Sequence, residues 1–261
     1  MRISEFSIDE VRVSGDDVHL SCHQIRQVIS SLKQEVFTDL TTTTTTRGIV
    51  AIRMERSAKL ICVIVTLLEV RVPFIFLRDD EDSASVGAEW LFDGKELTKF
   101  SCNGSGDQPV DVPEDSDLCY LIRTSGTTGM QKLIGVPYSC IEPNIEDFRE
   151  RFSLCSEDVI LCSTSVFFDP SIVEIFLALS CGSRLLLVPD KARSHPHLLS
   201  DILRRYKPTF VQFTPSVLAL LDDLTLSWIF WRFFTNSLSS YRRRKVSSES
   251  GATISHCFES N

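Results

Sequence analysis

Two apolar segments joined by one apolar helical segment constrain the fold of this chain more than any other feature. Residues 48–54 (GIVAIRM) and 72–77 predict buried strands, and Ser57 is placed to cap a helix that ends near Val70. Two strands joined by such a helix form a βαβ unit, in which the strands are parallel. The same order of strand, helix and strand returns in residues 159–188. The sequence therefore predicts an α/β fold with repeated βαβ units and a mainly parallel sheet.

The segments around these two units carry weaker signals. The spacing of Ile25 and Ile29 and their apolar neighbours predicts a helix within residues 16–40. Residues 78–117 are rich in Asp, Glu, Ser and Gly and predict a surface loop. Residues 209–213 predict one more strand of the sheet.

Charge and cysteine content exclude several classes of function. The net charge is −8. Of this, residues 1–224 carry −11 and the remaining tail carries +3, which argues against nucleic acid as a partner. The nine cysteines contain no CxxC pair, so neither a zinc site nor a disulfide framework is predicted. No segment has the length and apolarity of a membrane span, and no secretory signal is evident. We expect a cytoplasmic protein. The sequence assigns no residue as a metal ligand and none as a catalytic residue.

A run of small and hydroxylated residues directly follows the strand predicted at residues 118–123. It consists of Thr124, Ser125, Gly126, Thr127, Thr128, Gly129, Met130, Gln131 and Lys132. Backbone N–H groups of small residues can approach a polyphosphate closely, hydroxyl groups add donors, and the lysine adds positive charge. The spacing matches neither GxxxxGK[ST] nor GxGxxG, so a nicotinamide or flavin site has little support. We interpret this Ser/Thr/Gly loop as a phosphate-binding loop, with a plain polar surface turn as the alternative.

Residues 121–136 (LIRTSGTTGMQKLIGV) resemble the signature loop of the adenylate-forming superfamily. This superfamily comprises acyl-CoA synthetases, luciferases and the adenylation domains of nonribosomal peptide synthetases. The resemblance implies that the loop binds ATP while a carboxylate attacks the α-phosphorus, giving acyl-AMP and pyrophosphate. It also implies Mg²⁺ as a cofactor and, in longer members, a carrier domain as a partner. Fatty acids and amino acids such as β-alanine remain open as the carboxylate substrate.

A second segment of the resemblance places Asp169 in an FDxS motif with Phe168 and Ser171. In amino-acid-activating members of the superfamily, an Asp at this position pairs with the amino group of the substrate. The resemblance therefore implies that Asp169 binds substrate. The alternative is that Asp169, which directly precedes Pro170, only caps the following helix.

The resemblance ends near Asp223, and regular patterning ends there too. We expect residues 1–223 to be a partial adenylation domain and residues 224–261 to be an aberrant or disordered tail. These 261 residues contain no match to the later elements of the superfamily, including the segment whose Glu helps to hold Mg²⁺ and the C-terminal Lys. We therefore expect little or no activity from this chain alone. A non-catalytic module that binds nucleotide or a protein partner is the alternative function.

Overall fold

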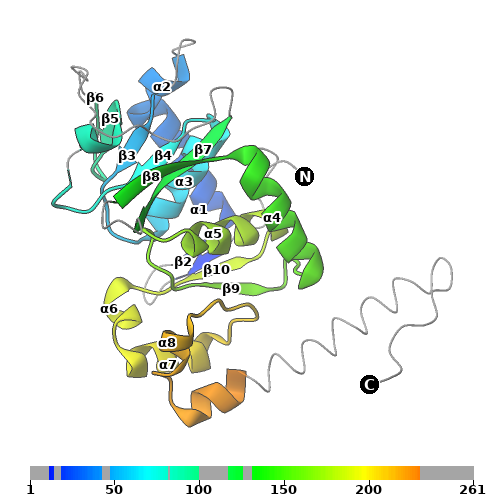
Figure 1. The fold of residues 1–261 in the computed structure, drawn as a ribbon. Coiled ribbons are helices and arrows are strands. Elements are labelled where there is room, and N and C mark those ends of the chain that lie inside the picture. The colour runs from blue at the N-terminus through cyan, green and yellow to red at the C-terminus, as the bar shows by residue number, and fades with distance from the viewer. Residues whose placement is uncertain are drawn as a thin grey trace, which may run out of the picture.

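The computed structural model describes residues 12–14, 19–42, 48–81, 83–99, 117–125 and 131–229. These residues form two β-sheets, and Figure 1 shows α1, α3 and α5 lying between them. The strands of the larger sheet are β3 (Val50–Ile52), β4 (Phe74–Phe76), β5 (Trp90–Phe92), β6 (Leu97–Lys99), β7 (Leu118–Ser125) and β8 (Gln131–Pro137). The strands of the smaller sheet are β1 (Arg12–Ser14), β2 (His19–Leu20), β9 (Val159–Cys162) and β10 (Arg184–Leu187).

Helices connect and cover the strands. They are α1 (Cys22–Ser31), α2 (Thr38–Thr42), α3 (Ala58–Glu69), α4 (Tyr138–Arg151), α5 (Pro170–Cys181), α6 (Asp190–Arg193), α7 (Pro196–Tyr206) and α8 (Pro215–Leu218). A π-helical turn and a 3₁₀ turn, η3 (Leu32–Val36) and η4 (Ser83–Val86), complete the labelled elements. Within the described ranges, no helix is long and apolar enough to cross a membrane.

The strand orders are β6-β5-β3-β4-β7-β8 in the larger sheet and β2-β1-β10-β9 in the smaller one. The inner pairings of both sheets are parallel, whereas β6, β8 and β2 at the edges pair antiparallel. The predicted α/β class and the mainly parallel pairing are thereby confirmed.

The first βαβ unit, β3–α3–β4, forms as predicted. The Ser57 side chain accepts a hydrogen bond from the N–H of Leu60 at 3.2 Å, which satisfies one of the donors that a helix start leaves free. Almost every residue of α3 is buried, from Ala58 to Leu68. A helix that is apolar on all sides is stable only when it is covered on all sides, and α3 meets this condition between the two sheets.

The second unit, β9–α5–β10, repeats the arrangement. Helix α5 begins with Pro170. Proline lacks a backbone N–H, but no hydrogen bond is lost in the first helical turn, because the N–H groups there have no partner within the helix. The helix ends at Gly182, which adopts the left-handed conformation with φ of 63°. The nine residues from Ser171 to Leu179 are all buried.

The prediction of a surface loop over residues 78–117 is wrong in part, because β5 and β6 extend the larger sheet. Trp90 and Phe92 are buried against its core. The turn between the strands is closed by the Asp93 carboxylate, which accepts hydrogen bonds from the N–H groups of Lys95 and Glu96 at 2.8 and 3.0 Å. The acidic and small residues on either side of this short hairpin hide its apolar signal.

Two further boundaries differ from those predicted. Residues 19–20 form a strand, and the helix predicted within residues 16–40 starts only at Cys22, where Ser21 and Gln24 form a reciprocal capping box. The strand predicted at residues 209–213 is reduced to one bridge from Phe210 to Ile160. Residues 223–229 are helical, whereas residues 230–261 of the predicted tail lie outside the described residues.

The cap of α3 can be tested by removing its acceptor. We expect Ser57→Ala to lower the free energy of unfolding by about 1 kcal/mol, because the N–H of Leu60 loses its partner inside a covered helix. Ser57→Asp retains an acceptor and should stay within about 0.3 kcal/mol of the parent chain. Urea unfolding measures both variants, and an equal loss in the two would contradict a capping role.

Candidate functional site

The Ser/Thr/Gly loop connects β7 to β8 in an antiparallel hairpin. Thr124 pairs with Lys132 and Ser125 pairs with Gln131 across the two strands. The Lys132 side chain is exposed and Thr124 is half-buried. The tip of the hairpin (Gly126, Thr127, Thr128, Gly129 and Met130) lies outside the described residues. Its assignment to phosphate binding therefore stays a prediction.

The position of β7 in the sheet determines where this loop lies. Strand β7 runs parallel to β4, with Phe74 opposite Tyr120. The loop therefore follows the carboxyl end of a parallel strand, which is the edge where ligands bind in open α/β sheets. Arg78, two residues beyond β4, is at the same edge.

Tyr120 connects β7 to the second predicted site segment. Its hydroxyl donates a hydrogen bond to Oδ1 of Asp169 at 2.6 Å, between residues 49 positions apart in the chain. The Tyr120 ring is 2% exposed and packs between Phe74 and Phe176, with ring centroids 6.1 and 6.4 Å away. Burial, and next the hydrogen bond to Asp169, raise the pKa of the Tyr120 hydroxyl. Tyr120 therefore remains a fixed hydrogen-bond donor.

Asp169 occupies the N-cap position of α5, but its carboxylate makes no capping hydrogen bond. Its backbone carbonyl accepts from the N–H of Ile172 at 2.9 Å, while its side chain bonds to Tyr120. The residue is exposed. This geometry disfavours a role confined to helix capping and leaves a carboxylate beside the loop strand.

A cavity of about 230 Å³ lies against both predicted site segments. From β7 it is lined by Tyr120 to Thr124, and from the segment before Asp169 by Val166, Phe167 and Phe168. The remaining lining residues are Ile75, Phe76, Arg78, Glu81 and Ile172. The structure thus brings together, around one cavity, two segments that the sequence indicated separately.

Sequence analysis missed the charged residues of this cavity. The Arg78 guanidinium lies 4.8 Å from the centre of the Phe167 ring, and its Nη1 is 3.1 Å from Oε1 of Glu81. Glu81 also forms an ion pair with Arg123. The signal that could have located Arg78 is its place just after a buried strand, at the edge where parallel strands end.

Mg²⁺ is the cofactor that the resemblance to the adenylate-forming superfamily implies. Across the described ranges, no group of three or more His, Cys, Asp or Glu side chains is arranged to hold a metal ion. The described residues therefore do not form a cation site of their own.

A buried carboxylate lies behind the segment that ends at Asp169. Glu174 of α5 is fully buried and accepts hydrogen bonds from the N–H and the hydroxyl of Thr164 at 3.2 and 2.6 Å. Burial raises the pKa of the Glu174 carboxyl to about 7, although the bonds from Thr164, the Arg56 charge and the Cys162 thiol oppose the rise. The sequence signal that could have located this residue is a Glu inside the apolar run SIVEIFLAL.

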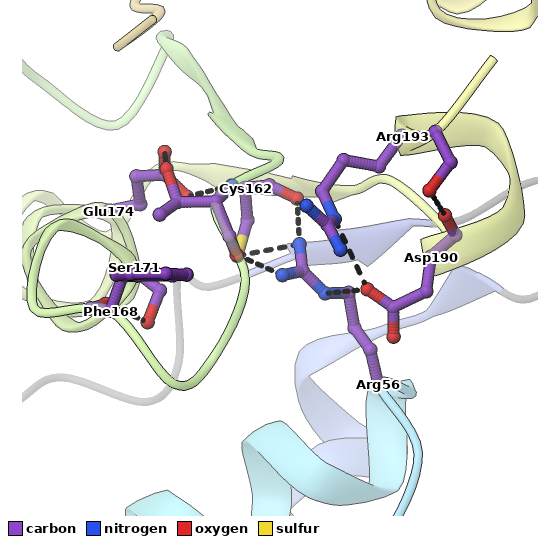
Figure 2. Close-up of polar contacts among 9 residues, drawn as sticks. Arg56, Cys162, Phe168, Ser171, Glu174, Asp190 and Arg193 are labelled. Carbon is purple, nitrogen blue, oxygen red and sulfur yellow. Dashed lines mark hydrogen bonds and ion pairs between the residues drawn. The ribbon is translucent and has the colours of Figure 1, made fainter. Parts of the chain in front are cut away.

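Arg56 approaches the same segment from the other side. Its side chain is 2% exposed, and its guanidinium donates to the backbone carbonyls of Cys162, at 2.7 Å, and of Thr164. Nε lies 3.9 Å from Oδ1 of Asp190. Figure 2 shows the Arg56 guanidinium between Cys162 and Asp190, with Glu174 beyond Cys162.

Comparison with known proteins gives a consistent result. The sequence profile of the family described as "AMP-binding enzyme" matches residues 27–255. The beta-alanine-activating enzyme of Mus musculus is 44% identical over 110 residues, which make up 42% of this chain and 10% of that protein. The chain thus spans about a tenth of the length of this relative.

Solved structures share the fold. The Vibrio cholerae adenylation domain AlmE, in complex with glycyl-adenosine-5'-phosphate, superposes with a TM-score of 0.63 at 16% identity. The match covers 84% of this chain and 48% of AlmE. The nonribosomal peptide synthetase FmoA3, in its alpha-methyl-L-serine-AMP bound form, gives a TM-score of 0.67 at 18% identity, over 88% of this chain and 29% of FmoA3.

The raised pKa of Glu174 predicts how stability depends on pH. The unfolded chain releases this proton near the usual value of 4.5, whereas the folded chain holds it to about 7. Between these values the folded state binds more protons, so the free energy of unfolding falls as the pH rises. The loss is on the order of 3 kcal/mol once the pH exceeds the folded value.

Glu174→Gln is the matched control, because an amide keeps the size of the side chain and does not titrate. Urea unfolding between about pH 5 and pH 8 should show the parent chain losing stability relative to this variant as the pH rises. A difference between the two chains that is independent of pH would contradict the raised pKa.

Proposed function

The chain belongs to the AMP-binding enzyme family, and from this membership we propose that it binds ATP through the Ser/Thr/Gly loop and activates a small amino acid as its adenylate. One observation carries the proposal. The hydrogen bond from Tyr120 to Asp169 links the strand that enters the loop to the carboxylate proposed to hold the amino group of the substrate. The cavity beside this pair provides space for the ligand.

The loop supplies the binding of the phosphates. Thr124 and Lys132 face each other across the hairpin, so the hydroxyl and the ammonium group are available at its base. The small residues between them contribute backbone N–H donors, as the sequence predicts. ATP supplies the activated phosphorus: a carboxylate oxygen forms a bond to the α-phosphorus, the bond to the β-phosphate oxygen breaks, and pyrophosphate leaves.

The charge of Asp169 favours an amino acid over a fatty acid. A carboxylate beside the cavity pairs well with an ammonium group and costs solvation free energy against a plain hydrocarbon chain. The names of the relatives point the same way, since they refer to β-alanine, a glycyl adenylate and an α-methyl-L-serine adenylate. We therefore propose a small amino acid as substrate, with β-alanine as the first candidate, and a carrier domain as the acceptor of the activated acyl group.

Binding is the first readout for this proposal. We expect these 261 residues alone to release pyrophosphate slowly, because the match covers only 48% of the adenylation domain AlmE. The affinity for ATP does not depend on turnover and tests the loop directly.

Removal of the loop lysine should weaken ATP binding. We expect Lys132→Ala to raise the Kd for ATP by about 10- to 100-fold, the size of one charge-assisted contact to phosphate. Gly126→Val should abolish binding, because a branched side chain keeps the backbone away from the phosphates. Isothermal titration calorimetry measures both variants.

Lys95→Ala is the matched control, since it removes the same charge from an exposed residue of the β5–β6 turn. If Lys95→Ala and Lys132→Ala had equal effects, general electrostatic attraction would explain the binding, and the loop assignment would be wrong.

Removal of the Asp169 charge should weaken binding of the amino acid and leave binding of the nucleotide unchanged. We expect Asp169→Asn to weaken β-alanine binding by about 10-fold or more in the presence of ATP, because the ammonium group loses a charged partner. The Kd for ATP should change less than about 2-fold. Butyrate, which has no amino group, should bind the parent chain and the variant equally weakly. Equal loss of ATP and β-alanine binding would point to general disruption of the site.

A further inference from the structure

The segment that carries Phe168 and Asp169 is held in place by two buried ionisable residues, Arg56 and Glu174. We call residues 163–169, between β9 and α5, the β9–α5 turn. One residue of this turn, Thr164, has its backbone N–H, its backbone carbonyl and its hydroxyl all engaged in hydrogen bonds to Arg56 or Glu174.

Glu174 holds Thr164 from the side of α5. The two oxygens of its carboxylate accept separately, Oε2 from the N–H at 3.2 Å and Oε1 from the hydroxyl at 2.6 Å. Because Glu174 lies one helical turn beyond the start of α5, these bonds fix the beginning of the turn against the helix that follows it.

Arg56 holds Thr164 from the side of α3. The guanidinium donates to the carbonyls of Cys162 and Thr164, so it bonds to the end of β9 and to the first part of the turn together. Its bonds reach 106 and 108 positions along the chain, from the first βαβ unit to the second. Asp190 of α6 balances part of the charge at 3.9 Å.

The remainder of the turn is tied to α5 by short-range bonds. The N–H of Phe168 donates to the carbonyl of Ser165 at 3.0 Å, and the Ser171 hydroxyl donates to the carbonyl of Phe168 at 2.8 Å. With Thr164 fixed at one end and α5 at the other, little freedom remains for Asp169. Its carboxylate is thereby kept within reach of Tyr120.

Buried charges are costly, and apolar side chains of similar size would fill the same space at a smaller cost. What Arg56 and Glu174 add is direction, because a carboxyl group and a guanidinium each bond several groups at defined angles. Such directional bonds are suited to holding a short irregular segment that carries site residues.

We propose that Arg56 and Glu174 are positioning residues, which hold Thr164 and so set the place of Asp169 and with it the affinity for the amino group of the substrate. Neither residue lines the cavity, and the effect on substrate affinity rests on the proposed function. The hydrogen bonds themselves do not depend on that function.

The experiment compares four variants of the full 261-residue chain. Thr164→Val removes the hydroxyl while keeping the branched shape, and Thr164→Ser keeps the hydroxyl. Arg56→Met removes the guanidinium and keeps a long side chain. Arg193→Met is the control, because Arg193 also bonds Asp190, at 3.4 Å, and makes no bond to the turn.

Two readouts separate the inference from the proposed function. Amide hydrogen exchange at positions 164 and 168 reports on the turn without any ligand. We expect exchange about 10-fold or more faster in Thr164→Val and Arg56→Met, and unchanged in Thr164→Ser and Arg193→Met. Calorimetry should show β-alanine affinity about 10-fold weaker in Thr164→Val and Arg56→Met, with ATP affinity within about 2-fold in all four variants.

Each outcome has a defined meaning. Unchanged exchange in folded Thr164→Val and Arg56→Met would overturn the inference whatever the chain binds. Faster exchange with unchanged β-alanine affinity would overturn the positioning role. Absence of β-alanine binding in the parent chain would overturn the proposed substrate and with it the role in affinity, while the exchange rates would still decide whether the bonds hold the turn.

Discussion

Helices α3 and α5 expose almost no side chain to solvent, because each lies between two sheets. Burial of one large apolar side chain is worth about 1.5–3 kcal/mol, and these two helices bury most of their residues. A single hydrogen bond contributes about 1 kcal/mol. Apolar burial therefore determines the arrangement of the two βαβ units, and the candidate site lies where their strands and helices end.

The candidate site follows from this arrangement. Parallel strands β4 and β7 end at the same edge of the larger sheet, and α5 begins close to it, as the bond between Tyr120 and Asp169 shows. The cavity is thus bounded by segments that the core has already fixed. Arg56 and Glu174 add hydrogen bonds to this arrangement, because both bind Thr164 in the irregular turn between β9 and α5, and Arg56 comes from the first βαβ unit.

The sequence predicted those features whose causes are local. Ser57 caps α3, and Gly182 ends α5, because capping depends on a few neighbouring residues. The hairpin of β5 and β6 was missed, since three-residue strands within a polar segment give no clear period. The sequence interprets the Ser/Thr/Gly loop as a phosphate-binding loop, and the structure describes only the base of this loop, at Thr124 and Lys132.

The relations between distant residues could not be predicted. Tyr120 and Asp169 are 49 positions apart, and Arg56 and Thr164 are 108 apart, so their contacts depend on how the two units pack. Glu174 is an intermediate case: a charged residue in an apolar helix signals a buried partner, but only the fold identifies Thr164 as that partner.

Amide NMR of the isotope-labelled chain, titrated with a non-hydrolysable ATP analogue, tests most directly whether the loop and the turn form one site. Shifts confined to residues 124–132 and to the β9–α5 turn are expected, with the helices between the sheets unaffected. The absence of chemical-shift changes in both segments, or changes concentrated on α7 and α8, would contradict a nucleotide site at this edge of the sheet.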